Sequence, residues 1–132
     1  MSDLATLIDA HLFAYADPDA KRRSAAVQRL WAEEGRLIDP PLTATGRDAI
    51  SHQAELLLKQ FPGHRFVRSS GIDSHHGQAR YAWQLRDPAG SLVLEGVDFA
   101  QLDGQGRLAQ ITGFFGALPV LQSAATSVAP AA

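Results

Sequence analysis

The strongest constraint on the fold is a change of hydrophobic period near the middle of the chain. Up to about residue 61, apolar residues recur roughly every 3.6 positions, which is typical of amphipathic helices. Beyond that point apolar and polar residues alternate and turn sequences separate the runs, which is typical of antiparallel hairpins. Helices followed by a meander of strands predict an α+β domain with the helices on one face of the sheet.

The helical half divides into three apolar stripes. The first starts behind Ser2 and Asp3, and the second follows Asp17-Pro18 and includes Trp31 on its apolar face. The third opens at residues 45–48, which resemble a capping box, and ends at the helix-breaking pair 62–63. A short strand is expected at 36–39, stopped by the two prolines that follow it.

The second half predicts four strands joined as antiparallel hairpins, near 64–72, 78–86, 91–102 and 107–117. If each four-residue turn pairs its flanking residues, Tyr81, Gly96 and Gly113 lie in one row. Two facing glycines would leave a hollow in the core, because neither contributes a side chain. Asp98 lies beside this hollow as the only charged residue on its face, so it must be paired or keep its proton.

The opposite face of the predicted sheet carries an apolar set interleaved with polar residues. Its apolar members are Val93, Val97, Phe99, Leu108 and Phe114, and its polar members are Glu95, Gln101, Gln110 and Thr112. Five large apolar side chains on one exposed face exceed what a monomer usually tolerates. The pattern therefore predicts a homodimer through the outer sheet face.

Composition excludes several classes of function. The 132 residues carry a net charge of −2 and no cysteine, so phosphate-backbone binding, disulfides and zinc–thiolate sites are not expected. No segment reads as a membrane span or a signal peptide, which leads us to expect a cytoplasmic protein without membrane or nucleic-acid partners. Residues 1–118 are expected to form a single domain, and the small-residue segment 119–132 is expected to be mostly a disordered tail.

Several short motifs carry a resemblance to a known family. They are Asp39-Pro40, Gly46-Arg47-Asp48-Ala49-Ile50, Gly96-Val97-Asp98-Phe99, Gly104-Gln105-Gly106-Arg107-Leu108 and Phe114-Phe115-Gly116. In order and spacing they resemble the nuclear transport factor 2-like superfamily, in its SnoaL-like and ketosteroid-isomerase-like branch. The resemblance implies a cone-shaped, curved antiparallel sheet wrapped by three N-terminal helices, a cystatin-like α+β roll. It also implies an apolar pocket, frequent dimerisation and no cofactor.

The isomerase pattern is only partly present in this chain. Its proton-shuttling aspartate falls on Asp39 and its hydrogen-bond-donating aspartate on Asp98, whose neutral state follows the behaviour described for that enzyme. Its first-helix tyrosine would fall near Ala10 or His11, so this chain lacks the tyrosine that donates to the oxyanion in the isomerase pattern. His11 is a candidate because imidazole titrates near neutrality, although a histidine on a helix stripe usually has a structural role in the core or at its edge.

We therefore expect a pocket for a small hydrophobic molecule, with Asp39, Asp98 and His11 as the catalytic candidates and no metal site. The lining is expected to come from Tyr81, Trp83, Gly96, Ile111, Gly113, Phe115, Trp31 and Gln53. The chemistry that fits is proton transfer by an isomerase, cyclase or dehydratase. A non-catalytic ligand-binding or dimeric interaction module on the same scaffold is the alternative, since a fold does not decide between them.

Overall fold

The computed structural model describes residues 3–122, and its three helices are those that the periodicity predicts. They are α1 (Leu4–Tyr15), α2 (Ala20–Leu30) and α3 (Arg47–Gln60). Asp3 caps α1 by accepting from the backbone N–H of Thr6, and Asp19 caps α2 in the same way. The expected capping box is wrong, because Gly46 caps α3 without a side-chain hydrogen bond.

Seven strands form one sheet with the order β2-β1-β7-β6-β5-β3, and β4 pairs with β5. They are β1 (Trp31–Asp39), β2 (Leu42–Thr45), β3 (Arg65–Arg68), β4 (Asp73–His75), β5 (Gln78–Arg86), β6 (Leu92–Leu102) and β7 (Leu108–Phe115). The sheet is mixed rather than wholly antiparallel, because β1 and β7 run parallel. The sequence did not predict β2, since the prolines after β1 form a turn back into the sheet.

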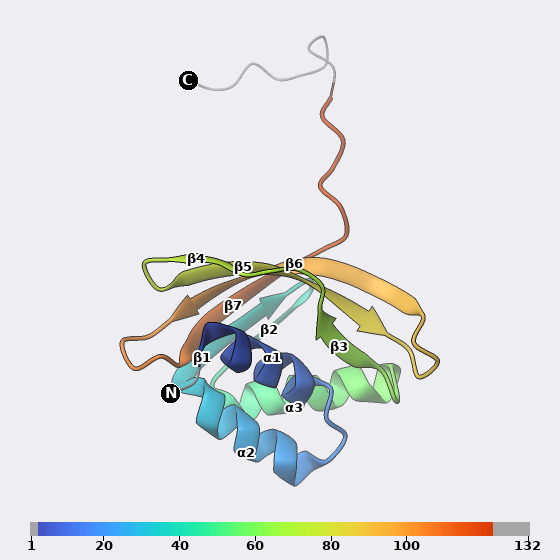
Figure 1. Cartoon of the computed structure of the whole chain (residues 1–132). Coiled ribbons are helices and arrows are strands. Elements are labelled where there is room, and N and C mark those ends of the chain that lie inside the picture. The colour runs from blue at the N-terminus through green and yellow to red at the C-terminus, as the bar shows by residue number, and fades with distance from the viewer. Residues whose placement is uncertain (1–2, 123–132) are drawn as a thin grey trace.

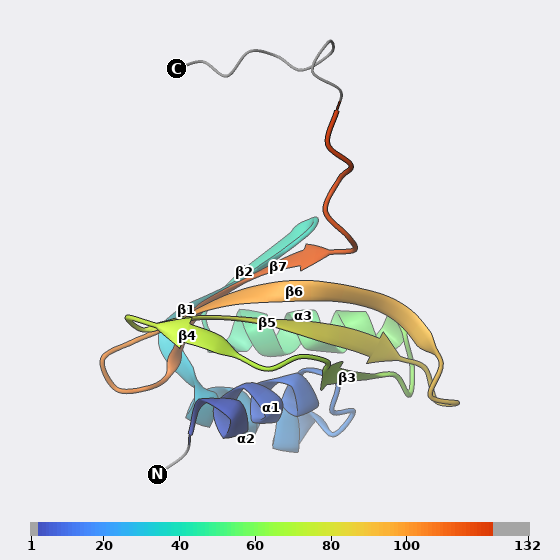
Figure 2. The same ribbon diagram turned by 45° about the horizontal axis from the view of Figure 1, so that its top comes forward.

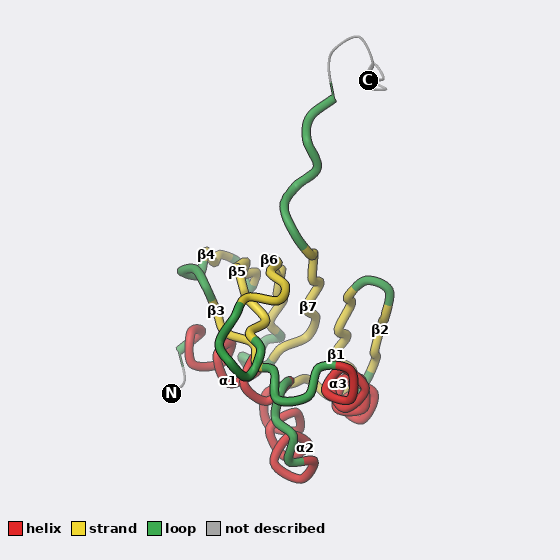
Figure 3. The backbone as a smooth tube through the Cα atoms, turned by 90° about the vertical axis from the view of Figure 1, so that its right-hand side faces the viewer, coloured by secondary structure: helices red, strands yellow, loops and turns green. Residues whose placement is uncertain are grey.

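The sheet curves over the helices, which pack on its concave side (Figure 1). Figure 2 shows the twist that separates the directions of β2 and β7 from that of β5. At one side α3 packs beside β1 and β2, and at the other α1 packs beneath β3 (Figure 3). The largest side chains of the core, all fully buried, are Trp31, Ile8, Ile50, Leu85, Leu108 and Ile111. Trp31 begins β1 instead of extending the second helix.

The hairpin registers differ from the expected ones by two residues. Arg86 pairs with Leu92 and Leu102 with Leu108, so each turn is one residue longer than assumed. A bulge next to each of these pairs adds the second residue. Because the displacement is even, most side chains keep their predicted face, but the row across three strands is Tyr81, Asp98 and Gly113.

Leu108 and Leu92, each next to a bulge, depart from the predicted faces, and Leu92 is 46% exposed instead of facing the helices. The bulge in β7 moves Leu108 from the outer face into the core, where it is fully buried. Gly116 follows β7, and residues 116–122 form neither helix nor strand and extend away from the body (Figure 1). Of the expected tail, residues 123–132 lie outside the described part of the chain. Among the helices within residues 3–122, none is both long and apolar enough to cross a membrane.

Candidate functional site

A cavity of about 270 Å³ lies between the concave face of the sheet and helices α1 and α3. Its walls are mainly apolar, and among the described residues that line it none is a lysine or an arginine. Of the residues expected at the site, those that line this cavity are Asp39, Asp98, His11, Trp83, Phe115 and Gln53. Those that do not line it are Tyr81, Gly96, Ile111, Gly113 and Trp31.

Asp98 lies in the middle of the sheet and is held by two neighbours on β5. The indole nitrogen of Trp83 donates to Oδ1 and the hydroxyl of Tyr81 donates to Oδ2, both at 2.9 Å. Burial raises the pKa of Asp98 to about 7, and the nearby charge of Asp39 adds to this shift while the two hydrogen bonds oppose it. Because an indole N–H can only donate, Oδ1 is an acceptor in either protonation state.

Asp39 ends β1 and reaches over the adjacent strand β7. A Cβ atom at Gly113 would overlap Oδ1 of Asp39 and would lie 3.1 Å from Oδ1 of Asp98. The two carboxyl groups therefore meet above this glycine. Burial raises the pKa of Asp39 to about 6, and within residues 3–122 no hydrogen bond to its carboxylate opposes the shift. Asp39 is thus a cavity-lining carboxylate without a partner in the described chain.

The two glycines of the expected hollow make room for functional side chains instead of empty space. At Gly96 a Cβ would lie 2.5 Å from the indole ring of Trp83 and would also overlap the backbone of β7. The missing side chain therefore lets the indole lie across β6 and reach Asp98. In the same way, the missing side chain of Gly113 leaves room for the carboxyl group of Asp39 over β7. The predicted hollow is wrong because these side chains fill it, and the cavity lies farther toward α1 and α3.

His11 is buried on α1 and lines the cavity. The indole nitrogen of Trp31 donates to its Nδ1 at 3.4 Å, so the proton of the neutral ring lies on Nε2. Burial lowers the pKa of His11 to about 4, which keeps the imidazole neutral near pH 7. Its Nε2–H is therefore the group that it can offer to the cavity.

Tyr15 is a site residue that the sequence analysis did not identify. It belongs to the apolar stripe of α1, yet its ring is buried at the cavity and Nε2 of Gln53 donates to its hydroxyl at 3.1 Å. The hydroxyl hydrogen is then free to donate. Burial, followed by the charge of Asp39, raises the pKa of Tyr15 and keeps the phenol protonated. Gln53, a polar residue that interrupts the stripe of α3, was a sequence feature that could have indicated a polar contact here, but it did not identify Tyr15 as the partner.

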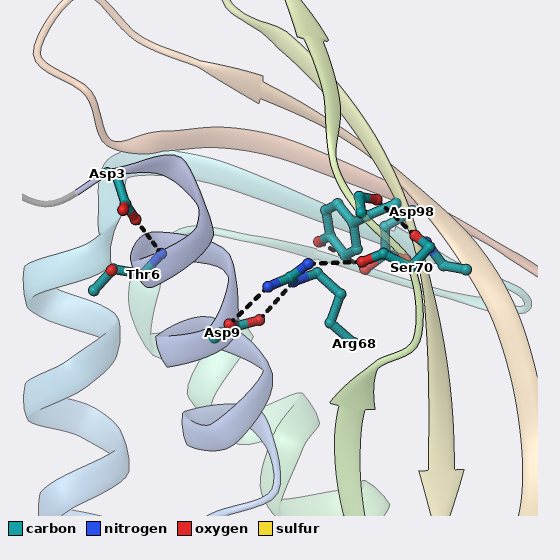
Figure 4. Close-up of polar contacts among 9 residues, drawn as sticks. Asp3, Thr6, Asp9, Arg68, Ser70 and Asp98 are labelled. Atoms are coloured by element: carbon teal, nitrogen blue, oxygen red, sulfur yellow. Dashed lines mark hydrogen bonds and ion pairs between the residues drawn. The ribbon is translucent and has the colours of Figure 1, made fainter.

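An ion pair between β3 and α1 lies beside these groups. Nε of Arg68 on β3 lies 2.8 Å from Oδ1 of Asp9 on α1, and Nη1 donates to the carbonyl of Ser70 (Figure 4). These contacts join α1 to the sheet on the side where Asp98 lies (Figure 4). Within the described residues, no group of three or more His, Asp or Glu side chains is placed to hold a metal ion.

Among the comparisons with known proteins, the one with solved structures identifies the family of this protein. No protein-family model matches the chain, and no curated protein matches it. A candidate isomerase of the SnoaL-like family from Agrobacterium tumefaciens C58 is 33% identical, with a TM-score of 0.81 over 86% of this chain and 97% of that one.

Two further structures share the fold at lower identity. A candidate SnoaL-like polyketide cyclase from Jannaschia sp. CCS1 is 14% identical, with a TM-score of 0.65 over 87% of this chain and 89% of that one. An NTF2-like protein of unknown function from Exiguobacterium sp. 255-15 is 17% identical, with a TM-score of 0.64 over 84% of this chain and 98% of that one. By its identity to the Agrobacterium protein across nearly that whole chain, this protein belongs to the SnoaL-like family of the nuclear transport factor 2-like superfamily.

Proposed function

We propose that the protein is a cofactor-independent enzyme that moves a proton at a carbon atom next to the carbonyl of a hydrophobic molecule. One observation carries the proposal: Asp39, a carboxylate without a partner among the described residues, shares an apolar cavity with two donors, Tyr15 and His11, whose hydrogens no described residue accepts. A base and neutral donors in one water-poor site are what enolate chemistry requires. The candidate isomerase among the similar structures supports this reaction class.

The reaction needs no atoms beyond those of the substrate and the protein. The Asp39 carboxylate takes a proton from the carbon next to the carbonyl, so the C–H bond breaks and its electron pair forms an enolate. The hydroxyl of Tyr15 and Nε2–H of His11 donate to the enolate oxygen, which bears the new charge. The carboxylic acid of Asp39 then returns the proton to the same carbon or to a conjugated one, which restores the base.

In our proposal Asp98 affects the reaction indirectly, through its neighbour Asp39. Its two oxygens accept from Tyr81 and Trp83, so the donor role that the family resemblance implied passes to Tyr15 and His11. Burial raises the pKa of both carboxyl groups, and the charge of Asp39 raises that of Asp98 further. Once Asp39 is ionised, its charge therefore favours the protonated form of Asp98.

The proposal is tested by deuterium incorporation from D2O into a set of neutral ketones, followed by NMR. Wild-type protein should exchange the hydrogens next to the carbonyl of at least one ketone, and Asp39→Asn should lose this activity. Asp48→Asn is the matched control, because Asp48 is exposed on the first turn of α3 and does not line the cavity. Specific ketone binding without exchange would instead support the non-catalytic binding module.

A further inference from the structure

The volume of the cavity, the charges of its lining residues and its free hydrogen-bond donors restrict which ligands it can bind. We propose that its ligand is an uncharged carbonyl compound of one or two rings, and that the site rejects carboxylates, amines and four-ring molecules. The prediction that the ligand carries a carbonyl group rests on the proposed function. The limits on the size and charge of the ligand follow from the residues that line the cavity.

The volume sets the upper limit on size. An apolar protein cavity of about 150 Å³ holds one benzene molecule. The cavity here, at about 270 Å³, is less than twice as large. It also lies below the roughly 300–1,000 Å³ typical of pockets for drug-sized ligands. Two fused rings with a small substituent therefore fill it, and a four-ring skeleton would leave a large part of its surface outside.

The shape of the walls favours flat rings. The rings of Phe66 and Trp83 meet edge to face with centroids 5.5 Å apart, and Trp83 and Phe115 meet in the same way at 5.6 Å. All three side chains line the cavity. They present both ring faces and ring edges, which pack against another aromatic ring with a favourable geometry.

The charges of the walls exclude anions. The ionisable acids that line the cavity are Asp39 and Asp98, and no described lining residue is a lysine or an arginine. A carboxylate ligand would enter an apolar site without a counter-ion and would face the negative charge of Asp39. Burying an unpaired charge is costly, and a like charge nearby adds to the cost.

The free donors favour a ligand that carries an acceptor over an ammonium ion, although an ammonium ion would pair with Asp39. Tyr15 and His11 each have one hydrogen that needs an acceptor, and an ammonium group has no lone pair to accept it. An amine paired with Asp39 would leave both donors buried and unsatisfied. A neutral carbonyl oxygen accepts both hydrogen bonds, and its two lone pairs match the two donors.

A matched set of ligands tests the proposal by isothermal titration calorimetry near pH 7.5. The set is 2-acetylnaphthalene, 2-naphthoate, 2-naphthylmethylamine and a four-ring steroid ketone. The naphthyl ketone should bind at least about tenfold more tightly than the other three. In Asp39→Asn the carboxylate should recover about tenfold in affinity, because the charge that repels it is gone. The Asp48→Asn control should bind the whole set like wild type.

Any other result would contradict the charge limit, the size limit or the proposed ligand class. Tighter binding of the naphthoate or the amine would contradict the charge limit, and tighter binding of the steroid would contradict the size limit. No measurable binding of the ketone would overturn the proposed ligand class. Failure of the proposed function is a separate result: selective ketone binding without deuterium exchange would leave the ligand class intact and remove the reaction.

Discussion

At the scale of single residues, the site depends on Asp39, a carboxylate that is shielded from water and accepts no hydrogen bond from the described residues. Asp39 lies among apolar side chains, and burial alone raises its pKa to about 6. Its neighbour Asp98 is more deeply buried and accepts two hydrogen bonds. The same residue type therefore acquires two roles from its surroundings: one carboxyl group is free to react and the other is fixed in place.

The first prediction concerns the loss of the base. Asp39→Asn should reduce the rate of deuterium exchange by about 10²–10⁴-fold, the usual contribution of a positioned general base. It should also raise the melting temperature at pH 8, because an amide is not penalised by burial as a carboxylate is. Thermal denaturation of wild type, Asp39→Asn and Asp48→Asn measures this. A variant less stable than wild type at pH 8 would show that the Asp39 carboxylate is satisfied.

The second prediction is the pH dependence of stability. Both carboxyl groups have folded-state pKa values, about 6 and about 7, above the ordinary value of 3.8. Between these limits the two carboxyl groups bind more protons in the folded protein than in the unfolded chain, so they lower the free energy of unfolding as pH rises from about 4 to about 7. His11, whose pKa is lowered from 6.5 to about 4, acts in the opposite direction over part of this range, so the contribution of Asp39 is read from the difference between wild type and Asp39→Asn.

Urea denaturation across this range measures the slope, and Asp39→Asn is the control. The variant retains Asp98 alone, so its slope should be shallower than that of wild type. Equal slopes for the two proteins would show that the pKa of Asp39 is not raised in the folded state.

The residue-scale analysis also shows what sequence alone can find. Asp98 could be identified because a carboxylate in an apolar pattern demands a partner or a proton, whereas Asp39 was identified through the family resemblance. Tyr15 could not, since a tyrosine in a helix stripe has the same appearance whether its hydroxyl lies in the core or at a cavity. Only the contact with Gln53, 38 positions away, gives that hydroxyl its place.

At the scale of secondary-structure elements, two glycines position the site. Gly96 lets Trp83 cross β6, and Gly113 lets Asp39 cross β7. The alternation of the strands predicted which residues share the helix-facing side, and the structure agrees for most of them but not for Leu108 and Leu92. It could not predict the register, because the length of each turn and the position of each bulge depend on backbone geometry as well as residue type.

The third prediction follows from the crowding at these glycines. Gly113→Ala should displace the Asp39 carboxylate, lower the exchange rate and destabilise the fold by about 1–3 kcal/mol, as overpacking usually does. Gly96→Ala should be at least as destabilising, because its Cβ would overlap backbone as well as an indole ring. Gly104→Ala is the matched control, since nothing lies within 4 Å of a Cβ there. An active Gly113→Ala variant of wild-type stability would contradict the placement of Asp39.

At the scale of the whole molecule, residues 3–122 leave one face of the sheet uncovered. Val93, Phe99 and Phe114 are 43%, 44% and 56% exposed on it, and the two phenylalanine rings pack edge to face at 5.8 Å. Without Leu108, this outer apolar set is smaller than the sequence predicted, yet it still forms a contiguous aromatic centre. We retain the proposal that a second copy of the chain covers it.

The fourth prediction is therefore a homodimer at micromolar concentration, measured by light scattering after size-exclusion chromatography. Phe99→Glu should give a monomer, because a carboxylate would be buried in the interface. Phe13→Glu is the control, since Phe13 is 67% exposed on α1 and lies outside the proposed interface. A monomeric wild type would contradict the proposal, and so would a dimer that Phe99→Glu leaves intact.

The central claim is that Asp39, with its raised pKa, is the base of the reaction. The most direct test is the pH dependence of kcat/KM for deuterium exchange into the two-ring ketone, because this quantity reports the pKa of the essential base in the free enzyme. The account predicts a rate that is low at pH 4 and rises with a midpoint near 6, the raised pKa of Asp39. A rate that is already maximal at pH 5, or one that rises only at alkaline pH, would contradict it.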